Sequence, residues 1–378
     1  AIGVLIENIG GICKMERKKA YYWCTCLQMI TPIKVRRLIE EAGGPSEIFG
    51  QSDEKLVQMG FTAREQRIYH EACAMEKTIE AEYEKLLQSG IRFVTIEDEE
   101  YPVLLKEVAD RPIGLFVKGN LPKSDFPKIA IVGARACSSY GKECAEEIAR
   151  ELSAAGAQIV SGMAYGIDCC SQKAALEAGS SYAVLGGGVD ICYPRENIGL
   201  YEKLIRQGGV ISEMRPKTRS IPVLFPRRNR IISGICDAVI IIEARKKSGS
   251  LITAEFAGEQ GRSVYAVPGS IFSDLSEGCH ELIRNGAVLL SSPQDILADF
   301  KLEAVARKVH RKKMPLTEIE QDVYRFIERE PVHMEILLQK TGYPAGTLCS
   351  ALFQMELKGY ISEEAGGCYK RTFNVSDS

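Results

Sequence analysis

The chain has 378 residues, of which 45% are hydrophobic and 26% are charged, and its formal net charge is −2 at pH 7. This length suffices for two or three folded domains, and the composition excludes a fibrous or disordered chain. No apolar stretch approaches the length of a membrane span, and the first residues lack the pattern of a secretion signal, so we expect a cytoplasmic protein with no membrane partner.

The cysteines and histidines do not indicate a metal centre. The thirteen cysteines are scattered without any C-x-x-C spacing, and we expect them to be reduced. The histidines stand too far apart for ligand spacing, at His70, His280, His310 and His333. We therefore expect no bound metal.

Residues 15–88 are predicted to form a small helical domain. Residues 35–42 have a helical pattern that ends at Gly43, and the charged run 63–87 carries apolar residues at helical spacing. The composition then changes to β-branched residues near residue 90, which marks the start of a second domain.

Residues 89–300 are predicted to form an α/β domain with a doubly wound, parallel, Rossmann-like sheet. Extended segments near residues 91–96 and 115–119 lead into a regular alternation of strands and helices. Right-handed crossovers would bring the carboxyl ends of all the parallel strands to one edge. The predicted strands are residues 129–132, 158–160, 182–185, 210–212, 238–242 and 263–267.

Residues 301–314 are predicted to be a basic linker, and residues 315–373 a winged-helix domain. Thr317 and Glu320 have the spacing of a capping box that opens a helix to about residue 329. Helical patterns at 333–342 and 345–359 and a hairpin around residues 364–367 complete the order of a winged helix. The third helix has only one basic residue, which favours a protein contact or weak DNA binding over base-specific reading.

The predicted strands of the central domain end in glycine or in charged residues. At this edge of an open α/β sheet ligands usually bind, and glycine backbone amides and helix N-termini favour an anion. The alternative is that the glycines only close tight turns. The segments concerned are 133–135, 162–166, 186–188, 213–215, 243–249 and 268–269.

Residues 214–236 contain six basic residues and no acidic residue. Their second half places Phe225 beside several arginines, a combination suited to unstacked bases and phosphates. The alternatives are a solvated charged surface and, for Phe225, a ring buried in the core.

The loop after the first parallel strand does not match a nucleotide cofactor site. Arg135 stands where a dinucleotide fingerprint needs its second glycine, and Gly141-Lys142 lacks the rest of a phosphate-binding loop. We therefore expect no cofactor. Arg135 can instead grip a phosphate, with Ser138 and Ser139 as neutral donors at the start of the next helix.

Six motifs, in this order, closely resemble those of the bacterial DNA-processing family called DprA or Smf. The resemblance implies a sterile-alpha-motif-like N-terminal part, an extended Rossmann domain and a C-terminal winged helix. It also implies a protein of natural transformation and recombination that binds single-stranded DNA, and double-stranded DNA more weakly. Such a protein protects incoming DNA, helps to displace single-strand-binding protein and loads the RecA recombinase. The motifs begin at Ile131, Ser161, Leu185, Phe225, Ser248 and Ala266.

The resemblance also assigns roles to individual residues. Arg135 would be a principal phosphate contact, although Ala134 replaces the family's serine and removes one donor. Phe225 would be a stacking platform, Arg228 and Arg230 would contact the backbone, and Asn229 would order the loop. The predicted DNA-binding residues are Gly133, Arg135, Ser138, Ser139, Gly162, Arg195, Phe225, Arg227, Arg228, Asn229, Arg230, Lys246, Lys247 and Ser248.

Members of this family form dimers through the far end of the Rossmann domain, which corresponds here to residues 278–289. The resemblance therefore implies a homodimer with His280, Ile283 and Leu289 at its interface. Simple packing within one chain is the alternative.

A nucleotide phosphoribohydrolase of the lysine-decarboxylase-like fold is the rival hypothesis, because such enzymes share the sheet architecture. Their glycine-rich catalytic loop has its nearest counterpart at residues 249–255, which lack the double glycine and misplace the acid. No paired acids and no Ser-His or Cys-His arrangement are evident. We therefore expect a binding protein rather than an enzyme.

Overall fold

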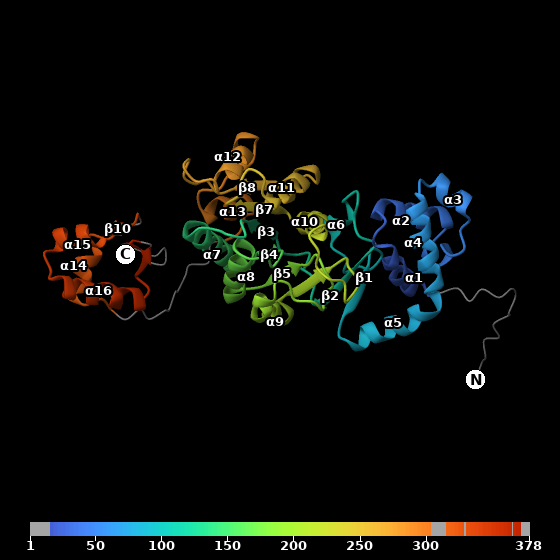
Figure 1. Ribbon diagram of the computed structural model, residues 1–378, viewed down its shortest axis with the longest axis horizontal. Helices are drawn as coiled ribbons and strands as arrows, with labels where there is room; N and C mark the ends of the chain where they lie inside the picture. The colour runs from blue at the N-terminus through green and yellow to red at the C-terminus, as the bar shows by residue number, and fades with distance from the viewer. Residues whose placement is uncertain (1–15, 304–314, 329, 365, 372–378) are drawn as a thin grey trace. The chain divides into compact units, whose positions relative to one another are not determined.

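A computed structural model describes residues 16–303, 315–328, 330–364 and 366–371 (Figure 1). The chain divides into two compact units, residues 1–305 and 306–378. Most of the predicted basic linker, residues 304–314, lies outside the described residues, as do the last two residues of the predicted winged-helix domain.

The first unit is built on a nine-stranded sheet with the order β1-β2-β6-β5-β4-β3-β7-β8-β9. The seven strands from β6 to β9 in this order are parallel, which confirms the predicted α/β fold, whereas β1 and β2 are antiparallel. The short edge strand β9 was not predicted. The bounds are β1 Arg92–Thr95, β2 Gly114–Gly119, β3 Lys128–Gly133, β4 Gln158–Ser161, β5 Ser181–Val184, β6 Gly209–Ser212, β7 Ala238–Ile242, β8 Ser263–Ala266 and β9 Val288–Leu289.

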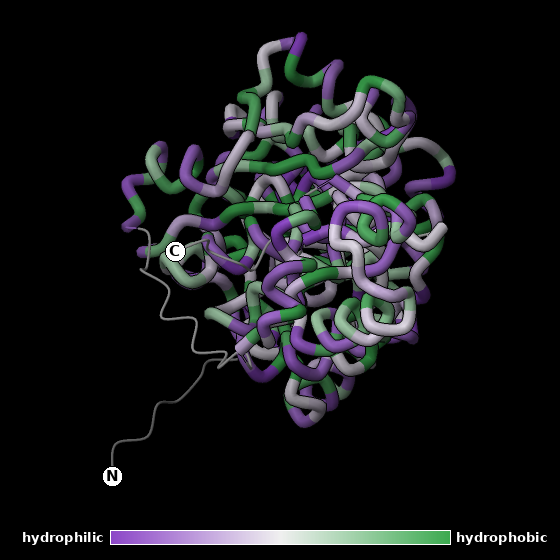
Figure 2. Tube along the Cα trace, turned by 90° about the vertical axis from the view of Figure 1, so that its left-hand side faces the viewer, coloured by the Kyte–Doolittle hydropathy of each residue, from purple (hydrophilic) through white to green (hydrophobic). Residues whose placement is uncertain are grey.

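Helices cover both faces of this sheet (Figure 1). On one face α7 (Ser139–Ala154), α8 (Ile167–Ala178) and α13 (Pro293–Asp299) enclose an apolar core, and α9 (Ile198–Gln207) packs beside α8. On the other face lie α6 (Val103–Lys106), α10 (Leu224–Ile235), α11 (Gly249–Glu259) and α12 (Glu277–Arg284). Along the helices hydrophobic and hydrophilic residues alternate, as expected of helices with one face on a sheet (Figure 2).

The N-terminal helices share a core with the sheet. The ring of Tyr22 packs against those of Phe93 and Phe116, with centroids 5.7 and 6.1 Å apart. The predicted boundary at residue 88 is therefore a change of secondary structure within one compact unit. The helices are α1 Arg17–Cys24, α2 Pro32–Ala42, α3 Asp53–Gln58, α4 Ala63–Ala74 and α5 Glu76–Gln88.

The second unit has the predicted winged-helix order. Thr317 and Glu320 form the predicted capping box, but the first helix ends at Tyr324, because the carbonyls of Tyr324 and Ile327 turn to accept hydrogen bonds from Arg371. The elements are α14 Glu318–Tyr324, β10 Val332–His333, α15 Met334–Thr341, α16 Ala345–Leu357, β11 Ile361–Glu364 and β12 Cys368–Arg371.

Candidate nucleic-acid interface

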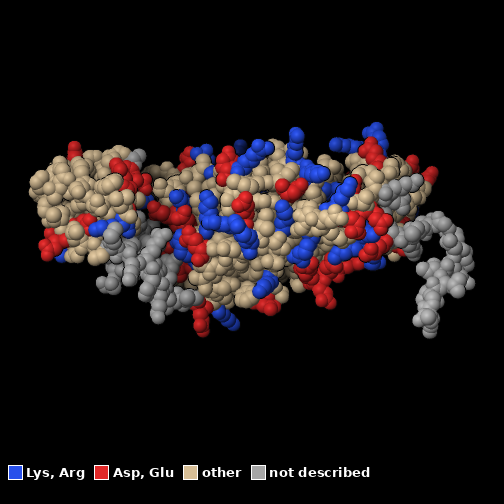
Figure 3. Space-filling model, turned by 90° about the horizontal axis from the view of Figure 1, so that it is seen from below, with Lys and Arg blue, Asp and Glu red and all other residues tan. Residues whose placement is uncertain are grey.

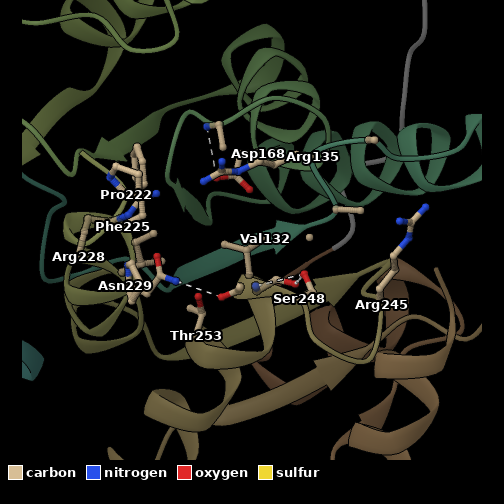
Figure 4. A pocket seen from close by; sticks show the side chains of 18 of the residues that line it. Val132, Arg135, Asp168, Pro222, Phe225, Arg228, Asn229, Arg245, Ser248 and Thr253 are labelled. Carbon is tan, nitrogen blue, oxygen red and sulfur yellow. Dashed lines mark hydrogen bonds between the residues drawn. The ribbon is translucent and has the colours of Figure 1, made fainter. Parts of the chain in front are cut away.

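A pocket of about 570 Å³ opens at the carboxyl ends of β3 and β7, beside the first turns of α10 and α11 (Figure 4). This is the edge of the sheet at which the sequence predicts an anion site. Half of the fourteen predicted DNA-binding residues line the pocket. They are Gly133, Arg135, Phe225, Arg228, Asn229, Lys247 and Ser248.

A cation and two aromatic rings stack at the mouth of the pocket. The Arg135 guanidinium lies 5.1 Å from the centroid of the Phe225 ring, and the Tyr193 ring lies 5.6 Å from Phe225 at an interplanar angle of 30°. Arg135 and Tyr193 are exposed and Phe225 is half-buried, so both rings keep accessible surface. Such a stack presents flat faces and a positive charge together, as bases and phosphates require.

Arg228 lies in the interior of the pocket. Arg228 is 6% exposed, one amino group donates to the carbonyl of Val184, and Nε has no hydrogen-bond partner among the described residues. Burial lowers the pKa of Arg228 to about 10, against the opposing effect of the Asp168 carboxylate, so the guanidinium remains charged at neutral pH. A charged guanidinium that lines a pocket and has one donor without a partner among the described residues is suited to an anion.

Asp168 interacts electrostatically with this arginine, and Gly162 leaves room for it. Burial raises the pKa of Asp168, which Arg228 opposes, and the carboxylate accepts a 3.1 Å hydrogen bond from the amide of Gly162. A Cβ atom at Gly162 would lie 2.1 Å from an Arg228 nitrogen. Gly162 therefore makes room for the guanidinium and does not itself line the pocket.

Three of the six basic residues of the run 214–236 form ion pairs with carboxylates from other parts of the chain, so the free positive charge is smaller than the sequence suggests. Arg230 is 2% exposed and forms ion pairs with Glu213 and Asp110. Arg227 forms an ion pair with Glu213 at 2.7 Å, and Arg215 forms one with Glu82. A guanidinium buried in two ion pairs cannot reach a DNA backbone, so we assign Arg230 a structural role.

Ser138 and Gly133 also make contacts within the protein. The amide and hydroxyl of Ser138 both donate to the carboxylate of Glu243, while its oxygen caps α7 through the amide of Gly141. A protein carboxylate thus already occupies the N-terminus of α7. A Cβ atom at Gly133 would lie 1.8 Å from the carbonyl oxygen of Ile242, so this glycine is needed for close pairing with β7.

The free cations near the pocket lie on the loop after β7. Arg245, Lys246 and Lys247 are exposed and form no ion pair within the described part of the chain. Arg245 and Lys247 line the pocket, whereas Lys246 does not. On the face drawn in Figure 3, basic and acidic side chains are interspersed.

The remaining predicted residues take several positions. Asn229 donates to the carbonyl of Gly249, at the start of α11, at 3.2 Å. Ser248 caps α11 through the amide of Ser250. Ser139 and Arg195 are exposed but do not line the pocket.

Tyr193 and Arg245 line the pocket but are absent from the predicted set. Both were signalled in the sequence, since Tyr193 lies in the family motif that begins at Leu185 and Arg245 begins the basic run that contains Lys246 and Lys247. The role of Tyr193 depends on its stack with Phe225, and the role of Arg245 depends on its having no ion pair among the described residues. Neither property can be read from the sequence.

The three predicted interface residues differ in their surroundings. The His280 ring lies 3.1 Å from the carbonyl oxygen of Gly269, and Ile283 packs partly against the core. Leu289 is 47% exposed and belongs to the edge strand β9. Ile271 and Phe272, on the loop after β8, add exposed apolar surface to this end of the unit.

The described residues contain no group of three or more side chains suited to hold a metal ion. None of the helices in the described ranges has the length and apolar character needed to span a bilayer.

Comparison with known proteins identifies the family. The family described as DNA recombination-mediator protein A matches residues 92–301, and the DprA winged helix domain matches residues 309–367. The chain is 41% identical to DNA processing protein DprA of Streptococcus pneumoniae over 256 residues, covering 67% of this chain and 90% of that protein. It is 34% identical to protein Smf of Escherichia coli over 336 residues, covering 85% and 89% of the two chains.

Two solved structures of DprA proteins also align with this chain. The X-ray structure of DprA from Streptococcus pneumoniae aligns with a TM-score of 0.66 and 35% identity, covering 76% of this chain and 99% of that one. A structure concerned with the single-stranded DNA binding mode of DNA processing protein A from Helicobacter pylori aligns with a TM-score of 0.51 and 30% identity, covering 56% and 96%. The family that matches is described as a recombination mediator, which sets the enzyme alternative aside. The chain therefore belongs to the DNA recombination-mediator protein A family.

Proposed function

We propose that this protein binds single-stranded DNA in the pocket at the carboxyl ends of β3 and β7, without regard to the base sequence. The observation that carries the proposal is the stack of Arg135, Phe225 and Tyr193 above the buried, incompletely bonded guanidinium of Arg228. Stacking rings accept any base and cations accept any phosphate, so the arrangement selects unpaired strands without reading them. The relative from Helicobacter pylori, whose structure concerns single-stranded DNA binding, supports this assignment.

The proposed contacts are fewer than the sequence predicts. Arg135, Arg245 and Lys247 supply exposed charge, and Arg228 supplies charge inside the pocket. Phe225 and Tyr193 provide the stacking surface. Lys246, Arg195 and Ser139 lie outside the pocket and would contact only a strand that continues beyond it.

Binding of a labelled oligo-dT strand is expected to weaken steeply with salt, and a matched duplex is expected to bind less tightly. Three exposed cations on phosphates would give a slope of about −2 in a plot of log affinity against log salt concentration. The duplex binds less well because its bases are paired and cannot reach Phe225. Fluorescence anisotropy at several salt concentrations measures both quantities, and equal affinity for the two DNAs would contradict the stacking role.

We also propose the further steps that the family resemblance implies. The bound strand would be protected, freed from single-strand-binding protein and transferred to the RecA recombinase during natural transformation and recombination. We place these steps in the cytoplasm, where RecA acts. They rest on family membership, and they require the strand binding described above.

We propose that the protein is a homodimer joined through the end of the sheet that carries β9. Replacing Leu289 by glutamate is expected to convert the dimer into a monomer, because Leu289 is exposed in one chain and a buried carboxylate opposes association. Light scattering gives the mass, and the folded monomer should bind long strands less tightly because two linked sites raise the effective concentration. Lys173→Glu, on an exposed residue of α8, is the control, and a variant that stays dimeric would refute this interface.

A further inference from the structure

A second pocket, of about 560 Å³, lies between the N-terminal helices and the sheet. Its walls come from α1, α5, β2 and the loops that follow β5 and β6. The residues that line it are Tyr22, Glu82, Lys85, Leu86, Ser89, Ile91, Lys118, Asp190, Arg215, Pro216 and Lys217.

The two acidic side chains of this pocket already have partners. Glu82 forms an ion pair with Arg215, and both carboxylate oxygens of Asp190 accept hydrogen bonds from the amide of Lys217, at 2.9 and 3.0 Å. Arg215 also stacks on the ring of Tyr22, with its guanidinium 4.7 Å from the ring centroid.

The basic side chains are in excess and largely free. Lys85, Lys118 and Lys217 have no carboxylate within ion-pair distance among the described residues. Lys118 donates a hydrogen bond to the hydroxyl of Tyr201 at 3.4 Å and lies 5.7 Å over its ring. Three lysines that line one cavity attract an anion.

One rigid loop joins this second pocket to the first. Ser220 lines the first pocket, Lys217 lines the second, and the exposed Arg219 lies between them in the chain. The loop is fixed because the amide of Gly188 donates to the carbonyl of Thr218 at 2.9 Å. A fixed, basic loop provides a path from one pocket to the other.

We propose that the second pocket binds the phosphate backbone of the same single strand after it leaves the first pocket. The inference rests on the proposed function and extends it, because it gives the N-terminal helices a part in strand binding through Lys85 of α5. Short strands would fill only the first pocket. Longer strands would gain affinity and salt dependence from the second.

The test compares two strand lengths in two double variants of the full chain. Lys85→Glu with Lys217→Glu alters the second pocket, and Lys173→Glu with Lys203→Glu makes the same change of net charge at exposed residues that line neither pocket. A strand of about 6 thymidines is long enough for the first pocket alone, and a strand of about 20 thymidines can reach both pockets. Anisotropy gives the affinity and the salt slope.

The second-pocket variant is expected to bind the long strand about tenfold less tightly, with a salt slope shallower by about 1, and the short strand as wild type does. The control variant should bind both strands nearly as tightly as wild type. Equal losses for the two variants, equal losses for the two strand lengths, or no loss at all would overturn the second site. Failure of the unaltered protein to bind either strand would instead overturn the proposed function itself.

Discussion

Replacing Arg135 by glutamate is expected to weaken the binding of single-stranded DNA by at least about 100-fold, which corresponds to about 3 kcal/mol. Arg135 is exposed at the mouth of the first pocket and stacks on Phe225, so the change removes a phosphate contact and places a negative charge beside the strand. Anisotropy with a labelled oligo-dT strand measures the loss. Circular dichroism should show an unchanged fold, because an exposed side chain is replaced.

Replacing Arg135 by lysine separates the effect of the positive charge on DNA affinity from the effect of the planar guanidinium. Arg135→Lys keeps the positive charge but loses the planar group that stacks on Phe225, so its affinity is expected to fall between those of wild type and Arg135→Glu. Wild-type affinity in a folded Arg135→Glu protein would refute the assignment of the site. Equal affinity of Arg135→Lys and wild type would show that the charge matters and the stack does not.

The sequence was sufficient to predict the sheet and the edge at which the first pocket lies. Each of the six predicted parallel strands is present, because buried strands such as β7, with five consecutive buried residues, are continuous apolar runs that periodicity detects. The antiparallel strands β1 and β2 were predicted as extended segments without their direction. Pairing direction depends on contacts between segments distant in sequence, and no local pattern encodes it.

The electrostatics of the site could not be predicted from the sequence. An acid-free basic segment suggests free charge, yet the partners of Arg215 and Arg230 come from residues 82, 110 and 213. In the sequence, Ser138 resembles a hydrogen-bond donor to a phosphate. In the structure its amide donates to the carboxylate of Glu243, which lies more than 100 residues away in the chain. Composition within a segment predicts charge, and only the fold determines which charges are neutralised.

Replacing Arg230 by alanine is expected to lower the free energy of unfolding of the first unit by about 3–5 kcal/mol, the usual cost of breaking a buried ion pair. Arg230 joins Glu213 to Asp110, so its removal leaves the buried Glu213 carboxylate with Arg227 alone. Urea unfolding followed by the fluorescence of Trp23 measures the change, because this single tryptophan is buried within the same unit.

Arg245→Ala is the matched control, because it removes the same type of side chain from an exposed position without an ion pair. Its unfolding free energy should change by no more than about 0.5 kcal/mol, while its affinity for single-stranded DNA falls. Replacing Arg230 would thus lower the stability of the protein, whereas replacing Arg245 would lower its affinity for single-stranded DNA. If Arg230→Ala were as stable as wild type but failed to bind DNA, Arg230 would be a direct DNA contact, as the sequence predicts, and its structural assignment would be wrong.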